Sequence, residues 1–232
     1  MEYSEHNSTV QSLFVATDCV VFGFESGELK VLLVRRDTEP FSGLWALPGG
    51  LMDSHDDADV CIRRKVWEET GLEDIYMEQL FTFTEAGRDP RGHIISIAYY
   101  ALAKQSDYLA YAGIDMDDIN WFSVERVPLL AFDHNRIVDT ALERLRKKIR
   151  YQPIGFELLE EKFTMPELHR LYEVILQTKL DNRNFRKKIL GYGLLLDLHE
   201  LQRGAPNRAP KLYSFNKDRY NELEKTGFYF EL

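Results

Sequence analysis

The sequence predicts an α/β protein of two domains, an N-terminal α/β/α sandwich and a C-terminal winged helix-turn-helix domain. Short strand-like runs surround one amphipathic helix in the first half, and two short helices joined by a tight turn follow in the second. A basic segment rich in glycine and proline comes after them. Length alone allows one large domain or two small ones, so we place the boundary between 152 and 153, where YQPIG at 151–155 breaks a helix.

The two predicted domains differ in charge. Residues 1–150 carry 16 Lys and Arg against 26 Asp and Glu, whereas residues 151–232 carry 13 against 12. This asymmetry is typical of an acidic module joined to one that meets polyanions. No apolar run is long enough to span a membrane, and the polar start lacks a signal peptide, so we expect a cytoplasmic protein. Cys19 and Cys61 lie in apolar contexts and are expected to be core thiols.

Alternating and clustered apolar residues predict the strands of the first domain. Leu13 to Phe24 and Leu29 to Val34 should form a hairpin about the turn ESG at 25–27. Met77 to Thr84, Ile94 to Lys104 and 119–123 are the other strand-like runs. LPGG at 47–50 then leads into the helix at the centre of the domain.

That helix lies within Gly50 to Leu72, GLMDSHDDADVCIRRKVWEETGL. Its spacing predicts that Val60, Val66 and Trp67 face the core, and Gly71 is a stop signal. The polar side chains expected on another side are Arg64, Glu68 and Glu69. These acids are either a solvated helix face or the remains of a metal site.

Lys65 bears on the second reading. Residues 65, 68 and 69 meet on one helical face, where three carboxylates would hold a divalent cation such as Mg²⁺. An ammonium there can pair with Glu68 and Glu69, so it removes a ligand and competes with the metal. An enzyme that activates water through a metal at such a site would lose its activity with this ligand. We therefore expect no catalytic residues, no metal and no cofactor.

The loop EAGRDPRGH at 85–93 is either an exposed connection or part of a ligand site. Glu85 and Arg88 are our candidate ligand-binding residues, because Arg88 can donate two hydrogen bonds to a hydroxylated or phosphorylated group. Trp45 is a core aromatic or a wall of the cleft. Asp133 is expected to be a helix N-cap, and His134, in the first turn of that helix, is a further ligand candidate.

The second domain begins with a capping box. Thr164 and Glu167 have the required spacing, and Pro166 lies in the tolerated first turn. A helix should run to about Gln177, and Asp181 should be the N-cap of the next. Two helices joined by so short a turn form a helix-turn-helix.

The second of these helices is the predicted DNA reader. Phe185 and Ile189 should pack inward, so that basic and amide side chains face outward, where they can read base edges and meet phosphates. These side chains are Asn182, Arg183, Asn184, Arg186 and Lys187. The segment QRGAPNRAPK at 202–211 predicts a wing that turns Arg203, Arg208 and Lys211 toward the DNA backbone.

The motifs resemble those of a known family. The central helix resembles the Nudix box, the signature of pyrophosphohydrolases, with Asp56 and Lys65 in place of two of its glutamates. Together with LPGG, GRDPRG at 87–92, LAFDH at 130–134, FTMPEL at 163–168 and RNFRKK at 183–188, the whole chain resembles the Nudix-related transcriptional regulators of the NrtR family.

The resemblance implies a homodimer that binds a palindromic double-stranded operator and responds to a small effector. Within the family the chain resembles the arabinose-responsive AraR branch, which implies a repressor of sugar utilisation genes that L-arabinose releases from DNA. ADP-ribose is the second candidate effector. The alternative is an active Mg²⁺-dependent Nudix hydrolase that acts on ADP-ribose or a related nucleoside diphosphate compound.

Overall fold

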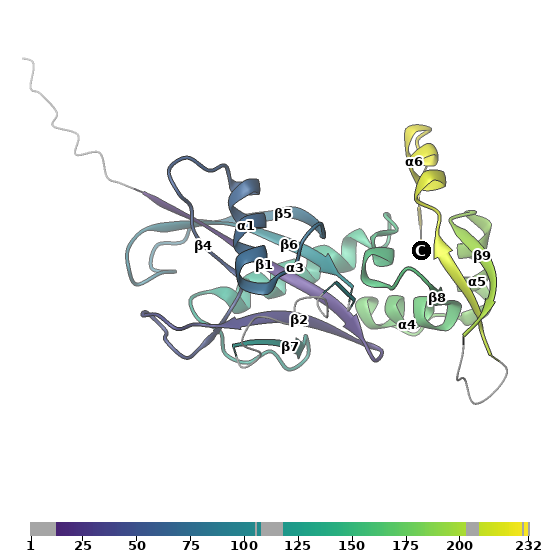
Figure 1. Cartoon of the computed structure of the whole chain (residues 1–232), viewed down its shortest axis with the longest axis horizontal. Coiled ribbons are helices and arrows are strands. Elements are labelled where there is room, and N and C mark those ends of the chain that lie inside the picture. The colour runs from purple at the N-terminus through teal and green to yellow at the C-terminus, as the bar shows by residue number, and fades with distance from the viewer. Residues whose placement is uncertain (1–12, 105, 108–117, 203–208, 229, 232) are drawn as a thin grey trace, which may run out of the picture.

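The computed structural model describes residues 13–104, 106–107, 118–202, 209–228 and 230–231. It contains an N-terminal unit built on a seven-stranded sheet and a smaller C-terminal unit built on a three-stranded sheet (Figure 1). No helix in these ranges is both long and apolar enough to cross a bilayer.

The large sheet has the strand order β3-β2-β1-β6-β5, with β4 paired to β1 and β7 paired to β2. All five predicted strands are confirmed, with ends that differ by at most one residue. Ser26 and Gly27 both adopt positive φ in the hairpin turn between the first two. The strands are β1 (Phe14–Glu25), β2 (Glu28–Arg35), β3 (Trp45–Ala46), β4 (Gly49–Leu51), β5 (Tyr76–Phe83), β6 (Ile94–Ala103) and β7 (Ile119–Ser123).

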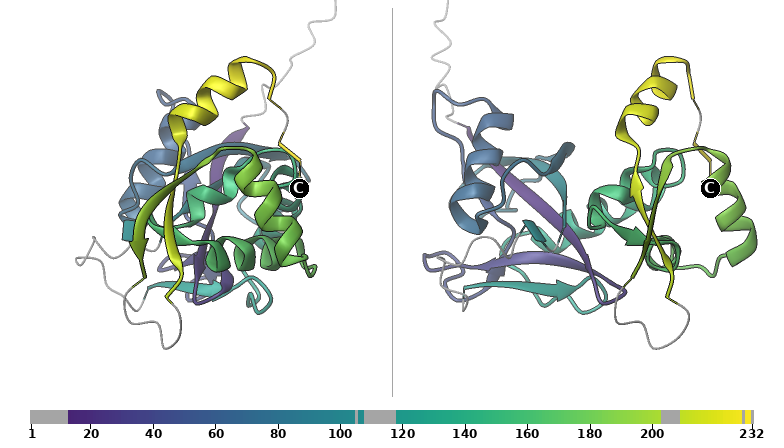
Figure 2. Two further views of the ribbon diagram at one scale, coloured as in Figure 1. Left: turned by 90° about the vertical axis from the view of Figure 1, so that its right-hand side faces the viewer. Right: turned by 45° about the vertical axis from the view of Figure 1, so that its right-hand side comes forward.

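Helices α1 (Ala58–Thr70) and α3 (His134–Lys148) cover opposite faces of this sheet (Figure 2). On α1, Val66 is buried as predicted. Val60 and Trp67 are 54% and 44% exposed, so their predicted core positions are wrong. The α1 stripe that reaches the sheet contains Cys61 and Ile62 instead. Cys19 and Cys61 are both buried free thiols, as expected.

The C-terminal unit has the predicted helix-turn-helix. The capping box of Thr164 and Glu167 forms at the start of α4 (Met165–Leu176), and Asp181 caps α5 (Asn182–Gly191) through a bond from the Asn184 N–H. Phe185 and Ile189 are buried, as predicted.

A small sheet and one further helix complete this unit. Its strands β8 (Phe163–Thr164), β10 (Lys211–Phe215) and β9 (Leu195–Leu201) pair in that order. The wing is therefore confirmed at its base, and the predicted wing residues Arg203 and Arg208 lie outside the described residues. The sequence reasoning missed α6 (Lys217–Lys225), which projects from the unit (Figure 2).

The two units share one apolar core. The cluster under α3 contains Phe22 of the sheet, Leu145 of α3 and Leu171 of α4. The connection between the units is part of this core, because Ile149 and Phe156, the latter in the 3₁₀ helix η1 (Ile154–Leu158), are also buried in it. The units are therefore packed together rather than joined by a free linker.

Candidate functional site

Helix α1 shows what the Lys65 ammonium does. Lys65 Nζ lies 3.7 Å from a carboxylate oxygen of Glu68, as the three-residue spacing predicts. Glu69 points elsewhere and accepts a 3.0 Å hydrogen bond from the Gly49 N–H. Arg64 lies 3.3 Å from Glu68 and also pairs with Asp56. Within the described ranges, no three His, Cys, Asp or Glu side chains are grouped to hold a metal ion.

Glu69 on this helix has a carboxyl with a raised pKa. Burial raises the pKa of its carboxyl from 4.5 to about 7, although the Gly49 N–H and the Lys65 charge oppose this shift. Gly49 is fixed in place, because a Cβ on it would lie 2.1 Å from the Thr17 carbonyl oxygen. Only glycine allows the chain to pass this close to β1 and to donate to Glu69.

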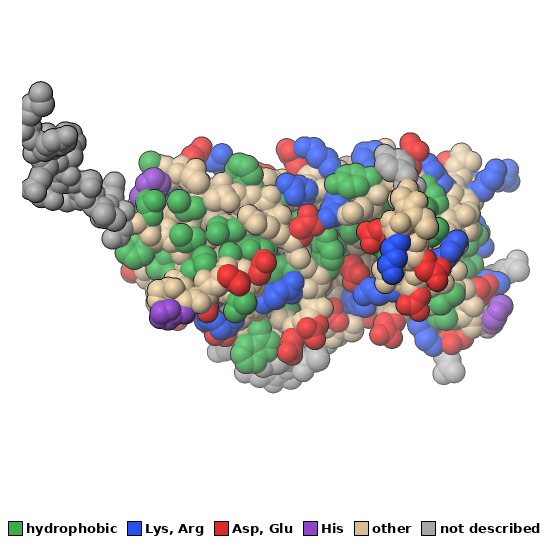
Figure 3. Space-filling model, turned by 90° about the horizontal axis from the view of Figure 1, so that it is seen from above, with side chains coloured by type: hydrophobic (Ala, Val, Ile, Leu, Met, Phe, Trp, Pro, Cys, Tyr) green, Lys and Arg blue, Asp and Glu red, His purple; other side chains and the backbone are tan. Residues whose placement is uncertain are grey.

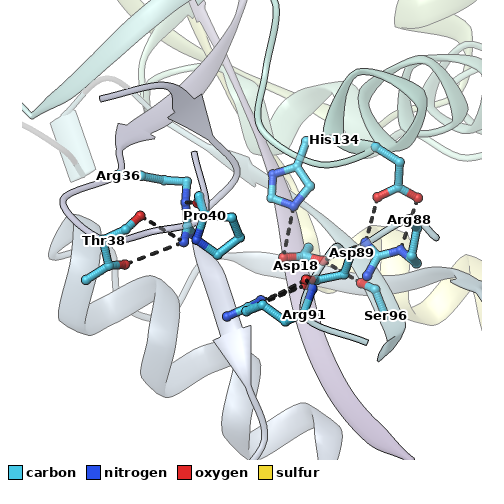
Figure 4. Close-up of polar contacts among 10 residues, drawn as sticks. Asp18, Arg36, Thr38, Pro40, Arg88, Asp89, Arg91, Ser96 and His134 are labelled. Carbon is cyan, nitrogen blue, oxygen red and sulfur yellow. Dashed lines mark hydrogen bonds and ion pairs between the residues drawn. The ribbon is translucent and has the colours of Figure 1, made fainter. Parts of the chain in front are cut away.

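A small pocket of about 70 Å³ lies where β1, β4, the 85–93 loop and the start of α3 meet. Its polar contacts are drawn in Figure 4. The residues that line it are Ala16, Asp18, Arg36, Leu47, Gly49, Gly50, Leu51, Arg88, Asp89, Arg91, Phe132 and His134. Two of the four predicted effector residues, Arg88 and His134, are among them.

Arg88 forms the buried floor of this pocket. Its guanidinium donates to both oxygens of Asp133, at 3.1 and 2.6 Å, and lies 3.6 Å from Asp18. The prediction that the Asp133 side chain caps α3 is wrong. Asp133 has the N-cap position of α3 but makes no side-chain capping bond, because its carboxylate is held by Arg88. The two hydrogen bonds that Arg88 was predicted to donate to a ligand are thus made to the Asp133 carboxylate.

His134 is held in one neutral tautomer. Its Nδ1 accepts a 2.9 Å hydrogen bond from the Leu47 N–H, and its Nε2 lies 3.5 Å from Asp18. Because Nδ1 is an acceptor, Nε2 carries the proton and faces the carboxylate. Burial lowers the pKa of the imidazole, although the charges of Asp18 and Asp133 oppose this. Ser96 donates a 2.5 Å hydrogen bond to the same Asp18.

The mouth of the pocket is cationic and aromatic. The guanidinium groups of Arg36 and Arg91 lie 4.8 and 5.3 Å from the centre of the Phe132 ring. Arg91 pairs with Asp89, whereas Arg36 donates to the carbonyls of the 38–40 turn at 3.0 and 3.4 Å. Burial, and then the neighbouring Arg91, lower the pKa of Arg36. Two guanidinium groups beside an aromatic ring are suited to an anionic ligand.

The sequence reasoning missed these mouth residues, and two of its ligand candidates, Glu85 and Trp45, do not line the pocket. Glu85 is exposed, pairs with Arg136 and does not line the pocket. Trp45 packs against the core and contacts Phe122, with 5.0 Å between ring centres. The pair RR at 35–36 could have indicated a ligand site, because the two arginines lie at the end of a strand beside the pocket. No local pattern, however, indicated that it would meet a ring nearly a hundred residues later.

Helix α5 presents the predicted recognition face. Asn182, Arg183, Asn184, Arg186 and Lys187 are all exposed, whereas Phe185 and Ile189 are buried. Arg186 also lies 3.5 Å from the hydroxyl of Tyr213 on β10, so it points toward the wing. Lys211 at the base of the wing pairs with Asp197 at 2.7 Å, which partly neutralises it.

Two family descriptions match the chain. Residues 13–142 match the NUDIX domain, and residues 155–215 match the NrtR DNA-binding winged helix domain. Among characterised relatives, the chain is 32% identical to "ADPR responsive transcriptional repressor NtrR" of Acinetobacter baylyi, over 92% of this chain and 86% of that protein. It is 33% identical to "ADP-ribose pyrophosphatase" of Methanocaldococcus jannaschii, over 54% of this chain and 73% of that one.

Solved structures of an NrtR protein are also similar to this chain. Shewanella oneidensis NrtR in complex with a 27mer DNA has a TM-score of 0.79 at 32% identity, covering 93% of this chain and 97% of that one. The NUDIX domain of the same Shewanella protein, in complex with ADP ribose, has a TM-score of 0.50 at 34% identity. That comparison covers 58% of this chain and 90% of the domain.

The raised pKa of Glu69 predicts a pH-dependent stability. The folded carboxyl binds its proton more tightly than the unfolded one, so its contribution to stability is complete below about pH 4.5 and is lost as pH rises through about 7. Glu69→Gln mimics the protonated form. We expect it to stabilise the protein by about 2 kcal/mol at pH 8 and by little at pH 5. Urea unfolding at both pH values measures this, and a pH-independent difference would contradict it.

Proposed function

The chain belongs to the NrtR family of Nudix-related regulators, and on this premise we propose that it is a transcriptional repressor whose Nudix domain senses ADP-ribose. The winged helix, with its exposed basic face on α5, carries the DNA-binding part of the proposal. We propose that two copies bind a palindromic operator, because a two-fold dimer presents its recognition helices to half-sites about 34 Å apart. Effector binding releases the DNA.

The pocket and the relatives both support ADP-ribose as the effector. The Acinetobacter relative is named as responsive to ADP-ribose, and the Shewanella NUDIX domain was solved in complex with ADP ribose. Neither comparison supports L-arabinose. The guanidinium groups of Arg36 and Arg91 suit a diphosphate, while a neutral pentose offers them no charge to pair with. The expectation of sugar utilisation genes rested on the same resemblance as L-arabinose, and we do not carry it into the proposal.

We propose the assignment of residues 1–152 to the effector domain and 153–232 to the DNA-binding domain. The end of α3 at Lys148 and the start of η1 at Ile154 support a boundary between them. Within the pocket, Arg36, Arg91 and Phe132 contact the ligand in this proposal. Arg88 and His134 hold Asp18 and Asp133 beneath it.

We further propose that the chain does not turn ADP-ribose over efficiently, because Lys65 replaces a metal-ligand glutamate. The alternative is a Mg²⁺-dependent hydrolase. It is favoured by the two remaining acids, Glu68 and Glu69, and by the likeness to the Methanocaldococcus enzyme.

The choice of effector can be tested by thermal unfolding and operator binding. At a hundredfold excess over its Kd, ADP-ribose should stabilise the fold by about 2.7 kcal/mol, while L-arabinose should not. Arg36→Ala should weaken ADP-ribose binding about tenfold or more, because it removes a charge-assisted contact. Arg150→Ala, an exposed arginine elsewhere, is the control. Stabilisation by L-arabinose alone would reverse the assignment.

The DNA-reading face can be tested on an operator selected from a random DNA pool by the full-length protein. Arg183→Ala and Arg186→Ala should each cost about 1–3 kcal/mol in operator binding and relax base preference. Calorimetry should give unchanged ADP-ribose affinity for both variants. Arg63→Ala on α1 is the matched control, and equal losses in that variant would mean that charge alone, and not the α5 face, drives binding.

Turnover separates the two functions. With Mg²⁺ and ADP-ribose, we expect the wild-type chain to release no AMP above the uncatalysed rate. Lys65→Glu should bind Mg²⁺ more tightly, because it restores three carboxylates at spacings of three and four. Chromatographic detection of AMP and metal titration measure the two effects. Brisk Mg²⁺-dependent release by the wild type would favour the hydrolase.

A further inference from the structure

Strand β9 has a bulge at the base of the wing. Its pairing with β10 is regular up to Asp197, which lies opposite Tyr213. The next pair joins Leu201 to Lys211, so three residues of β9 lie opposite a single residue of β10. Extra residues in one strand bend it and redirect a side chain, and such bulges are frequent beside functional sites. The residue at the centre of this bulge is His199.

The backbone of His199 is held in an unfavourable conformation. Its φ is 55°, in the left-handed region that is uncommon for residues other than glycine. The Asp197 carboxylate stabilises this conformation by accepting a 2.9 Å hydrogen bond from the His199 N–H. The imidazole is 87% exposed, and its Nδ1 lies 3.7 Å from the same carboxylate. So exposed a side chain contributes little packing, and glycine would therefore suit the fold at least as well.

The bulge lies beside the predicted recognition helix. Residues directly opposite in an antiparallel pair project to the same side of the sheet, so the Asp197 side chain lies on the side of Tyr213. The Tyr213 hydroxyl is 3.5 Å from a terminal nitrogen of Arg186 on α5. Helix α5 and β9 both lie at the end of the molecule away from the N-terminal unit (Figure 2). The His199 imidazole, close to Asp197, is therefore on the side of the wing that faces α5.

The acids of β9 are neutralised by lysines. Lys211 Nζ lies 2.7 Å from Asp197, and Lys162 Nζ lies 2.8 Å from Glu200. Seen from above, Lys and Arg side chains are interspersed with Asp and Glu over the C-terminal unit (Figure 3). Both acids of β9 thus have a lysine partner, so an anionic group that approaches His199 meets no unpaired carboxylate of this strand.

We propose that His199 contacts operator DNA, where its imidazole donates a hydrogen bond to a backbone phosphate. This inference rests on the DNA binding of the proposed function and adds a residue to its interface. An imidazole N–H is a donor, and phosphate oxygens accept a large share of the hydrogen bonds that proteins make to DNA. Asp197 is then a positioning residue, because it holds the His199 backbone in the conformation that presents the ring.

Operator binding by full-length His199→Gly tests the assignment. Glycine removes the imidazole and adopts positive φ readily, so the variant should stay folded, with its Tm raised by about 2–4 °C. It should bind the selected operator about tenfold more weakly, because one hydrogen bond to a charged group is lost. Its affinity for an unrelated duplex should fall by the same factor, because a phosphate contact does not depend on base sequence.

Two further variants separate the side chain from the backbone. Asp74→Gly is the matched control, because Asp74 is also exposed, has a φ of 54° and lies in the N-terminal unit. It should raise the Tm in the same way and leave operator affinity unchanged. His199→Asn tolerates positive φ and keeps an N–H donor, so it should recover most of the affinity that glycine loses.

The outcomes separate this inference from the proposed function. Wild-type operator affinity in His199→Gly removes His199 from the interface but leaves the α5 face and the repressor intact. A loss confined to the operator would mean that His199 reads a base, which overturns the phosphate contact. A lowered Tm together with weaker binding would give His199 a structural role in the wing instead. A wild-type chain that binds no DNA overturns both the proposed function and this inference.

Discussion

The apolar packing of α3 against α4 is the interaction on which the rest of the structure depends. Leu145 and Ile149 are fully buried between the sheet and Leu171, and each such side chain stabilises the fold by about 1.5–3 kcal/mol. Arg146 adds a 3.1 Å hydrogen bond to the Ile175 carbonyl. A rotation of the winged helix about 149–155 would therefore have to remove core side chains from their neighbours. A shift of α3 and α4 as one body keeps these contacts.

The same helix begins at the pocket mouth, which gives the two sites a physical connection. Phe132 directly precedes Asp133, the N-cap residue of α3, and has a φ of 53°. The ring centre of Phe41, which has a φ of 70°, lies 5.0 Å from that of Phe132. Positive φ at bulky residues costs about 1–3 kcal/mol, so the surrounding contacts hold both residues in place. A ligand that draws Arg36 and Arg91 away from Phe132 removes part of that support. The start of α3 is the part of the helix nearest to such a change.

Local chemistry could be predicted from the sequence, and long-range assembly could not. The capping box at Thr164, the cap at Asp181 and the inward pair Phe185 and Ile189 depend on residues a few positions apart, and all formed as predicted. Arg88 lines the pocket, but its partner Asp133 is 45 residues away and had a plausible local role as a cap. Helical spacing also could not show which apolar stripe of α1 meets the sheet, so Trp67 was misplaced.

The ion pairs of the wing affect how DNA binding responds to salt. Each phosphate that a free lysine neutralises releases a condensed counterion, and this release is what makes affinity fall with ionic strength. Lys211 already has a partner in Asp197, and Lys162 has one in Glu200. Before it meets a phosphate, Lys211 must leave a carboxylate that then takes up a cation from solution. The affinity of the proposed operator binding should thus depend on ionic strength less steeply than a count of the basic residues suggests.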